Sequence, residues 1–254
     1  MSVLTFLSDF GADSHYMASF RGAMYKQNIQ IPFIEISSRI EPFDIVEAAY
    51  LSDMVYQDFP KGSIHILATN VVATSFAGHL AAMYNGHYFL APDNGILSLV
   101  FGEYFSDYYL IPTERYEQNI QNVYLPFIQL LMENKNLAPI APVANDFIVK
   151  TRQYPTQDGA ELRGAVLFVD HFGNAYTNIS KYDYERFASN QSCDILLGRH
   201  TVVNSIRENF AEVKAGDPIC YFSDHGFLVV AIKQSSASRL LNLRKTKPII
   251  IKKR

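Results

Sequence analysis

The pattern of apolar residues in this chain changes near residue 160. In the first half, short apolar runs of strand type alternate with segments whose apolar residues recur at helical spacing. The predicted strands are Val3–Leu7, Pro32–Ile36, Ile64–Ala68 and His87–Ala91, and the predicted helices are His15–Gln27 and Asp44–Met54. Because parallel neighbouring strands need crossover connections, this alternation predicts an α/β domain with a mainly parallel sheet and helices on its faces.

Beyond residue 160 the chain contains short β-runs separated by turn residues. The predicted strands are Gly164–Val169, Ala175–Ile179, Asp194–Leu197, Ile219–Phe222 and Phe227–Ile232. This spacing favours a small all-β domain, a barrel or a sandwich. Residues 113–160 show few strands and end in a polar segment, Gln153 to Gly159, which is the best boundary. We therefore predict an N-terminal α/β domain over 1–150 and a C-terminal all-β domain over 160–254.

Composition narrows the classes of partner. With 254 residues, 48% of them hydrophobic, the chain can bury one or two cores. A formal charge of −3 argues against a protein that binds nucleic acid through phosphates. The basic cluster from Arg244 to Arg254 is interpreted as a solvated terminus. We expect no nucleic-acid partner.

The cysteines and the apolar segments indicate the compartment. Cys193 and Cys220 are the only cysteines, too few for a disulfide framework or a structural zinc site, so a reducing compartment fits. No targeting segment and no apolar run of membrane-spanning length is found in the sequence. We therefore expect a cytoplasmic protein with no membrane partner.

Two apolar strands each run into an aspartate, a phenylalanine and a glycine. The first motif is Asp9-Phe10-Gly11, and the second is Asp170-His171-Phe172-Gly173-Asn174. An aspartate can accept both hydrogen bonds of a ribose diol while a phenyl ring covers a base, and glycine lets the backbone approach a ligand closely. This combination favours a nucleoside ligand, at the strand ends where open α/β sheets bind ligands. The alternative is a pair of tight turns with capping aspartates.

Five strings in order resemble a known family. They are Ser8-Asp9-Phe10-Gly11 with His15-Tyr16, Glu41-Pro42-Phe43-Asp44-Ile45 with Glu47-Ala48-Ala49, Pro60-Lys61-Gly62-Ser63-Ile64-His65, Ala91-Pro92-Asp93-Asn94-Gly95-Ile96-Leu97-Ser98, and Val169-Asp170-His171-Phe172-Gly173-Asn174 with Thr177-Asn178-Ile179. Together they resemble the S-adenosylmethionine (SAM) hydroxide adenosyltransferase family, the relatives of the fluorinase and chlorinase. The resemblance covers nearly the full chain.

The resemblance implies an N-terminal α/β domain, a C-terminal β-barrel and a homotrimer. It places the nucleoside ligand between the N-terminal domain of one subunit and the C-terminal domain of its neighbour. Asp9 would take the ribose hydroxyls, and Phe43 would line the pocket near the reacting carbon. Asp170 and Asn174 would hold the methionine or adenine end, with Phe172 packed on the ligand. SAM is expected as substrate or ligand, with no metal and no further cofactor.

The chain departs from the family at the three positions that orient water. Asn70 stands where the family's hydrolases have an aspartate, Ala77 where they have an arginine, and Asn119 where they have a histidine. The catalytic candidates are therefore Asn70, Asn119 and His79, a histidine that could serve as a substitute base. The alternative for His79 is a position on a helix that packs on the sheet.

Several functions follow from the resemblance and its departures. The first is hydrolysis of SAM to adenosine and methionine, with a relocated water site. The second is a catalytically inactive homologue that binds or senses a nucleoside, and the third is a scaffold without a ligand. Halide transfer is a weaker alternative, because its hydroxyl candidates Thr69, Thr74 and Ser75 are also ordinary turn residues.

Overall fold

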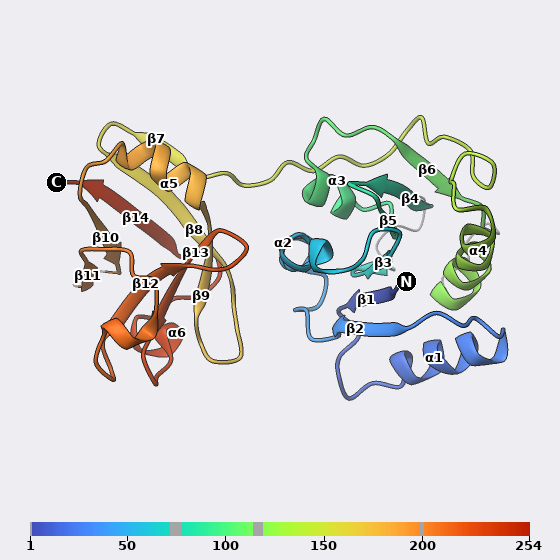
Figure 1. Cartoon of the computed structure of the whole chain (residues 1–254), viewed down its shortest axis with the longest axis horizontal. Helices are drawn as coiled ribbons and strands as arrows, with labels where there is room; N and C mark the ends of the chain where they lie inside the picture. The colour runs from blue at the N-terminus through green and yellow to red at the C-terminus, as the bar shows by residue number, and fades with distance from the viewer. Residues whose placement is uncertain (1, 72–77, 114–118, 199–200) are drawn as a thin grey trace. The chain divides into compact units, whose positions relative to one another are not determined.

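The computed structural model describes residues 2–71, 78–113, 119–198 and 201–254. The chain forms two compact units, Met1–Arg152 and Gln153–Arg254 (Figure 1). The first unit is a mixed α/β domain and the second is an antiparallel β-barrel that nearly closes. The fold class expected from the sequence is confirmed.

The N-terminal unit is built on one six-stranded sheet. Its elements are β1 (Leu4–Ser8), α1 (Tyr16–Lys26), β2 (Phe33–Ser37), α2 (Ile45–Val55), the 3-10 turn η1 (Tyr56–Asp58), β3 (Ile64–Ala68), β4 (His79–Tyr84), β5 (His87–Pro92), α3 (Ile96–Phe101), β6 (Tyr108–Ile111) and α4 (Ile120–Asn134). The strand order is β2-β1-β3-β5-β4-β6. Neighbours pair in parallel from β2 to β5, whereas β4 pairs antiparallel with both β5 and β6.

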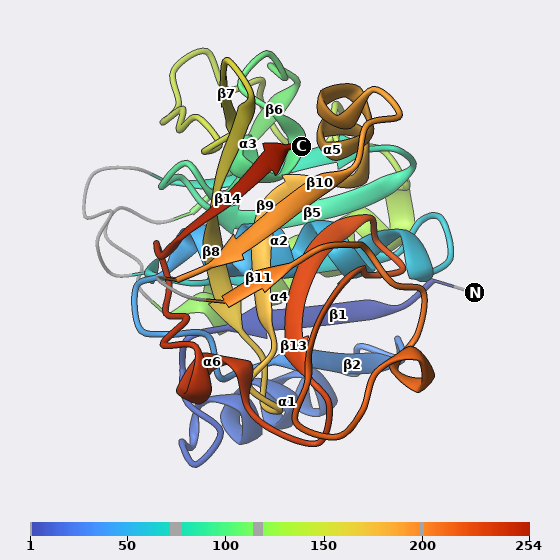
Figure 2. The same cartoon turned by 90° about the vertical axis from the view of Figure 1, so that its left-hand side faces the viewer.

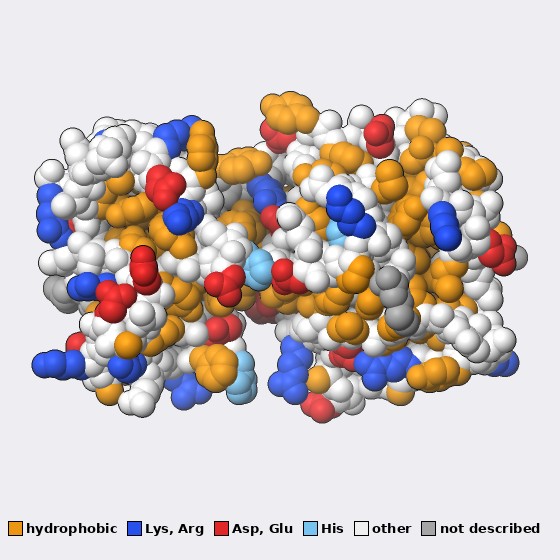
Figure 3. Space-filling model, in the orientation of Figure 1, with side chains coloured by type: hydrophobic (Ala, Val, Ile, Leu, Met, Phe, Trp, Pro, Cys, Tyr) orange, Lys and Arg blue, Asp and Glu red, His pale blue; other side chains and the backbone are white. Residues whose placement is uncertain are grey.

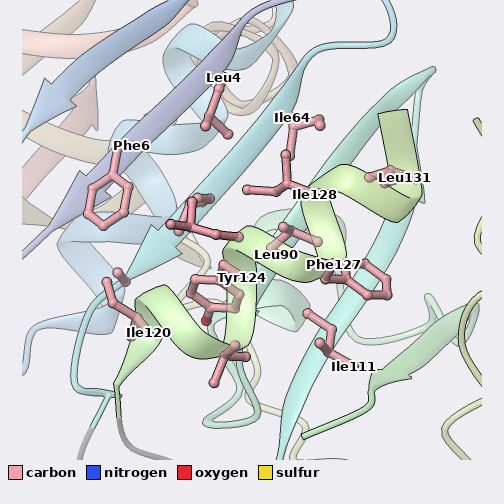
Figure 4. Packing of buried hydrophobic residues seen from close by; sticks show 14 of the residues in the cluster. Leu4, Phe6, Ile64, Leu90, Ile111, Ile120, Tyr124, Phe127, Ile128 and Leu131 are labelled. Atoms are coloured by element: carbon pink, nitrogen blue, oxygen red, sulfur yellow. The ribbon is translucent and has the colours of Figure 1, made fainter. Parts of the chain in front are cut away.

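Helices cover both faces of this sheet because its side chains alternate in direction. Leu4 and Phe6 of β1 join the apolar cluster formed with α1 and α4, whereas Leu7 joins the cluster formed with α2 and α3. Figure 4 shows the first cluster, with Tyr124 and Ile128 of α4 among the side chains of the strands. The loops that follow β1, β2 and β3 therefore meet at one edge of a rigid three-layer unit.

The strand β4 lies at a place where the sequence prediction contains no strand. It forms a hairpin with β5 through Asn85 and Gly86, whose φ angles are 51° and 84°. Two left-handed residues are what a type I′ turn requires. The expectation that His79 sits on a helix, offered as the alternative to a catalytic role, is wrong, since His79 is the first residue of β4.

The C-terminal unit is an antiparallel sheet that curves toward closure. Its elements are β7 (Thr156–Asp158), β8 (Glu161–Val169), β9 (Ala175–Ser180), α5 (Lys181–Ala188), β10 (Cys193–Leu197), β11 (Thr201–Val203), the 3-10 turn η3 (Phe210–Glu212), β12 (Pro218–Phe222), β13 (Phe227–Ile232), α6 (Ala237–Leu240) and β14 (Pro248–Lys253). The order is β11-β10-β14-β8-β9-β13-β12, with β7 beside β8. Among the described residues, a parallel bridge between Ile206, which follows β11, and Cys220 of β12 links the two ends of the sheet.

The basic C-terminal segment is part of the barrel. The interpretation of Arg244 to Arg254 as a solvated terminus is wrong for β14, which lies between β8 and β10 and pairs with both (Figure 2). Ile249 and Ile251 of this strand are fully buried. Of its two lysines, Lys252 pairs at the surface, with Nζ 2.6 Å from a carboxylate oxygen of Glu161, and Lys253 Nζ lies 5.0 Å from the centre of the Phe187 ring. Along β14 the residues alternate between buried, at Ile249 and Ile251, and more exposed, at Ile250 and Lys252, as in a strand with one buried face.

The buried amide of Asn178 holds the start of the C-terminal unit. Its Oδ1 accepts a hydrogen bond from the Ala165 backbone N–H at 2.7 Å, and its Nδ2 donates to the Gln153 carbonyl at 2.7 Å. Gly164 packs against it so closely that a Cβ there would lie 2.6 Å from Asn178 Oδ1. The Thr177-Asn178-Ile179 string therefore has a structural explanation in this chain.

The surface carries charges of both signs. Acidic and basic side chains are interspersed over the face shown in Figure 3. None of the helices in the described part of the chain has the length and apolar character needed to cross a membrane.

Candidate functional site

The carboxylate of Asp9 connects the loops at the ends of three parallel strands. Asp9 follows β1, and its Oδ2 accepts hydrogen bonds from the backbone N–H of Phe43 at 2.8 Å and of Asn70 at 3.1 Å. Phe43 lies between β2 and α2, and Asn70 follows β3. Asp9 Oδ1 has no hydrogen bond to any residue that the structure describes. One oxygen of Asp9 thus orders the loops, and the other remains available to a ligand.

Both residues that donate to Asp9 have a left-handed backbone. The φ angle is 70° at Phe43 and 54° at Asn70. Asparagine adopts this region at modest cost, but for a bulky residue such as phenylalanine it is rare and unfavourable. In this left-handed conformation the backbone N–H of Phe43 donates to Asp9, and the Phe43 ring is 70% exposed. Strained residues of this kind concentrate at binding sites.

A hollow of about 640 Å³ opens beside Asp9, and we call it the Asp9 hollow. This volume lies within the range of ordinary small-molecule sites. Four of the residues predicted from the sequence line it, namely Asp9, Phe43, Asn70 and Asn119. Of the eight other lining residues, none of which was predicted as a site residue, four are polar: His15, Tyr16, Ser19 and Gln121. The first three belong to the start of α1 and could have been found from their place directly after the Asp-Phe-Gly turn.

Aromatic rings and neutral polar groups form the walls of this hollow. The rings of Phe10 and Tyr16 lie 5.2 Å apart, and Gln121 Nε2 donates to Ser19 Oγ at 2.8 Å, which ties α4 to α1. Asn119 caps α4 by accepting a hydrogen bond from the Gln121 backbone N–H at 3.0 Å. This capping bond gives Asn119 a structural role in addition to its place in the lining.

His79 lies apart from this set. It is buried on β4, where its Nδ1 is 2.9 Å from the Oη of Tyr124, a fully buried tyrosine. Burial lowers the pKa of His79 to about 4, so the ring is neutral near pH 7. It is not among the described residues that line the Asp9 hollow.

A second buried histidine lies at the amino end of β3. His65 Nδ1 is 2.7 Å from Thr5 Oγ1, and His65 Nε2 is 3.1 Å from His87 Nδ1. Burial, and secondarily the neighbouring His87, lower the pKa of His65 to about 3. Both ring nitrogens of His65 are therefore engaged inside the protein.

The second motif, Asp170-His171-Phe172-Gly173-Asn174, forms a self-contained loop between β8 and β9. Asp170 Oδ1 accepts hydrogen bonds from the backbone N–H groups of Phe172 and Asn174, each at 2.9 Å, and Oδ2 accepts from Asn174 Nδ2 at 2.8 Å. Gly173 has a φ of 87°, and a Cβ there would lie 2.1 Å from Ser236 Oγ. Asp170 thus organises the loop, and Gly173 lets it pack on the turn before α6.

Phe172 and Asn174 line a separate hollow of about 480 Å³ in the C-terminal unit. The ring of Phe172 is 76% exposed, and Ser235 and Ser236 also line the hollow. An exposed ring beside an ordered amide suits stacking and hydrogen bonding to a planar ligand. Each of the two hollows belongs to one unit of the chain.

One acidic group within the described residues has the spacing of metal ligands. Oxygens of Glu41, Asp44 and Glu47 lie within 4.8 Å of one another. Asp44 caps α2 by accepting from the Val46 and Glu47 backbone N–H groups. The pKa of Glu47 is raised, chiefly by burial. These groups have a helix-capping explanation, and nothing further indicates a cation.

The positions that bear on halide or water chemistry are only partly described. Thr69 is fully buried, and its Oγ1 has no hydrogen-bond partner among the described residues. Thr74, Ser75 and Ala77 lie outside the described residues.

Comparison with protein families assigns both units. The model of the SAM hydroxide adenosyltransferase N-terminal domain matches residues 4–125, and the model of the C-terminal domain matches residues 164–250. The chain belongs to the SAM hydroxide adenosyltransferase family. The family assignment made from the motifs is thereby confirmed.

Relatives of this SAM hydroxide adenosyltransferase family member include proteins named for different reactions. The chain is 25% identical to the (R)-S-adenosyl-L-methionine hydrolase of Methanocaldococcus jannaschii, over 96% of this chain and 93% of that protein. It is 24% identical to the fluorinase of Nocardia brasiliensis, over 95% and 94%. A crystal structure of an uncharacterized conserved protein from Thermotoga maritima matches 99% of this chain and 100% of that one, with 24% identity and a TM-score of 0.84, which establishes the fold.

Proposed function

We propose that this chain binds the adenosine part of SAM in the Asp9 hollow and hydrolyses SAM to adenosine and methionine. The observation that carries the proposal is that the two oxygens of the Asp9 carboxylate differ in their hydrogen bonds. Its Oδ2 accepts two backbone N–H groups, which leaves Oδ1 to accept from the hydroxyls of a ribose. The family, and the hydrolase among the relatives, supply the reaction that such a site would perform.

The chemistry asks mainly for positioning. Water attacks the 5′ carbon, the carbon–sulfur bond breaks with its electron pair going to sulfur, and methionine leaves as a neutral thioether. Because a sulfonium is already a good leaving group, a protein must orient water in line and remove competing solvent. The aromatic walls contributed by Phe10, Tyr16 and Phe43 suit the base and the exclusion of water.

A second candidate function is binding without turnover. It is favoured by the neutral amides of Asn70 and Asn119, neither of which can take a proton from water near pH 7. Asn119 is also engaged in capping α4.

Chromatography of SAM incubated with the purified full chain separates these functions. Formation of adenosine and methionine in excess over protein supports hydrolysis. Stoichiometric retention of SAM or adenosine in equilibrium dialysis, without products, supports the binding function. The absence of both products and retention would contradict the proposal and favour a scaffold.

We further propose that the ligand is shared between copies in a homotrimer, as the family resemblance implies. The loop of Asp170, Phe172 and Asn174 from one copy would then meet the ligand held by Asp9 of another. An exposed Phe172 ring and an ordered Asn174 amide are the features that support this role.

Mixing two inactive variants tests the shared site. Asp9→Ala and Phe172→Ala are each expected to bind adenosine weakly, but a mixture refolded together in equal amounts should regain about a quarter of the binding sites, since intact halves meet at random. Calorimetry measures the number of sites, and light scattering measures the mass of the assembly. No recovery in a trimeric mixture would contradict a site built from two copies.

A further inference from the structure

Hydrolysis of a sulfonium releases a proton from the attacking water. Among the described residues that line the Asp9 hollow, only Asp9, His15 and Tyr16 have side chains that titrate. Asp9 already accepts two backbone N–H groups, and a tyrosine hydroxyl ordinarily holds its proton near pH 7. The lining therefore offers one imidazole, that of His15.

The geometry of His15 leaves its ring available to solvent. His15 is the residue that precedes α1, and its side chain makes no capping hydrogen bond. The ring is exposed, lies 4.3 Å from the ring of Tyr16 between centroids, and has no hydrogen bond to any described residue. Contact with Tyr16 restricts the ring while both nitrogens stay open to water.

The other histidines with resolved interactions in this unit differ in this respect. His79 and His65 are buried, and their ring nitrogens contact Tyr124, Thr5 and His87. A ring buried in the core does not reach the water of an open hollow, so neither histidine can take a proton from that water. The contrast between buried and exposed rings separates His15 from the base candidate that the sequence suggested.

We propose that His15 is a catalytic residue that accepts the proton of the attacking water. The inference rests on the proposed hydrolysis and names a group for it. The water oxygen bonds to the 5′ carbon, the sulfur takes the electron pair of the broken bond, and the water proton passes to an imidazole nitrogen and then to bulk solvent. The products are adenosine, methionine and one proton.

Substitution and chemical rescue test this role. His15→Gln keeps a hydrogen-bonding side chain but cannot take the proton, so kcat for adenosine formation should fall about 100-fold or more while KM changes less than about threefold. The kcat of His15→Ala should fall by a similar factor, and added imidazole should restore part of it. Tyr25→Ala changes an exposed side chain of α1, the helix that His15 precedes, outside the Asp9 hollow; it is the matched control and should keep the wild-type rate.

The outcomes separate this inference from the proposed function. Unchanged kcat in His15→Gln, or loss of kcat in His15→Ala without imidazole rescue, would overturn the role of His15 while leaving hydrolysis intact. If the wild-type protein binds adenosine but forms no adenosine from SAM, both hydrolysis and the role of His15 are overturned, and binding is left as the function. Circular dichroism and adenosine affinity of each variant identify any loss of fold or of ligand.

Discussion

Replacing Asp9 by alanine is expected to lower the affinity for adenosine at least 100-fold. Hydrogen bonds to a charged group each contribute about 1.5–3 kcal/mol, and the ribose diol would lose two of them. The variant also removes the acceptor of the Phe43 and Asn70 N–H groups, so the loops that shape the Asp9 hollow lose their common anchor. Calorimetric titration with adenosine measures the change, and the melting temperature shows whether the fold survives.

Two comparisons separate sugar recognition from loop anchoring. Asp9→Asn keeps one oxygen that can accept from both loops but turns the other acceptor into a donor, so it should bind adenosine weakly while keeping the loops. Wild type should discriminate against 2′-deoxyadenosine, and both Asp9 variants should not. Asp13→Asn, on an exposed carboxylate outside the lining, should behave as wild type. Equal adenosine affinity in wild type and Asp9→Ala would rule out this site.

The free energy of unfolding should fall as pH is lowered from 7 to 5. The pKa of His65 is lowered to about 3 and that of His79 to about 4, so both stay neutral in the folded protein. In the unfolded chain a histidine takes up a proton below about pH 6.5. The unfolded state therefore binds more protons in this range, and each histidine lowers stability by up to about 1.4 kcal/mol per pH unit. The loss begins near pH 6.5 and continues toward the folded-state values.

Urea unfolding at several pH values between 5 and 7.5 measures this dependence. His79→Asn places an amide near the position of Nδ1, can still meet the Tyr124 hydroxyl, and does not titrate. Below pH 6.5 its free energy of unfolding should vary less steeply with pH than that of the wild type. The difference in slope should correspond to about one bound proton. Parallel curves for the two proteins would show that His79 is already protonated in the fold or exposed to water.

The first β–α–β elements could be read from the sequence because pattern and structure agree there. The expected strand Ile64–Ala68 is the observed β3, and the expected helix Asp44–Met54 differs by one residue at each end from α2. The sequence pattern does not predict the β4 hairpin, although Asn85-Gly86 is a strong turn signal. Its strand, His-Leu-Ala-Ala-Met-Tyr, has mostly small or unbranched residues and lacks the alternation of a strand with one face in water.

Helix α4 and strand β14 were missed for different reasons. Ile120, Tyr124, Ile128 and Leu131 recur at helical spacing, but Pro126 stands inside the helix and obscured it. In β14 the lysines around Ile249 and Ile251 suggested a solvated tail, whereas the strand pairs on both sides. Local charge was a poor guide there because the partners, Glu161 among them, are distant in sequence.

The residue types of the site could be anticipated more readily than their roles. The Asp-Phe-Gly motifs pointed to Asp9 and Asp170, but the hydrogen bonds of their carboxylates to backbone N–H groups depend on loop conformations that a sequence does not show. The left-handed backbone of Phe43 is one such conformation. His15 stands directly after the Asp-Phe-Gly turn, which places it near the site in the sequence, but its share in the lining of the Asp9 hollow depends on the packing of α1 beside the loop.

The dual bonding of Asp9 also affects how inactive descendants of such a protein would look. In a homologue that no longer binds a nucleoside, replacing Asp9 would still displace the loops that it holds. The same is true of Asp170 in the barrel. The presence of the two aspartates is therefore compatible with an active protein and with an inactive one. Active and inactive members of this family are better distinguished by positions such as 15. The side chain there makes no capping hydrogen bond, so a loss of function is not masked by a structural role.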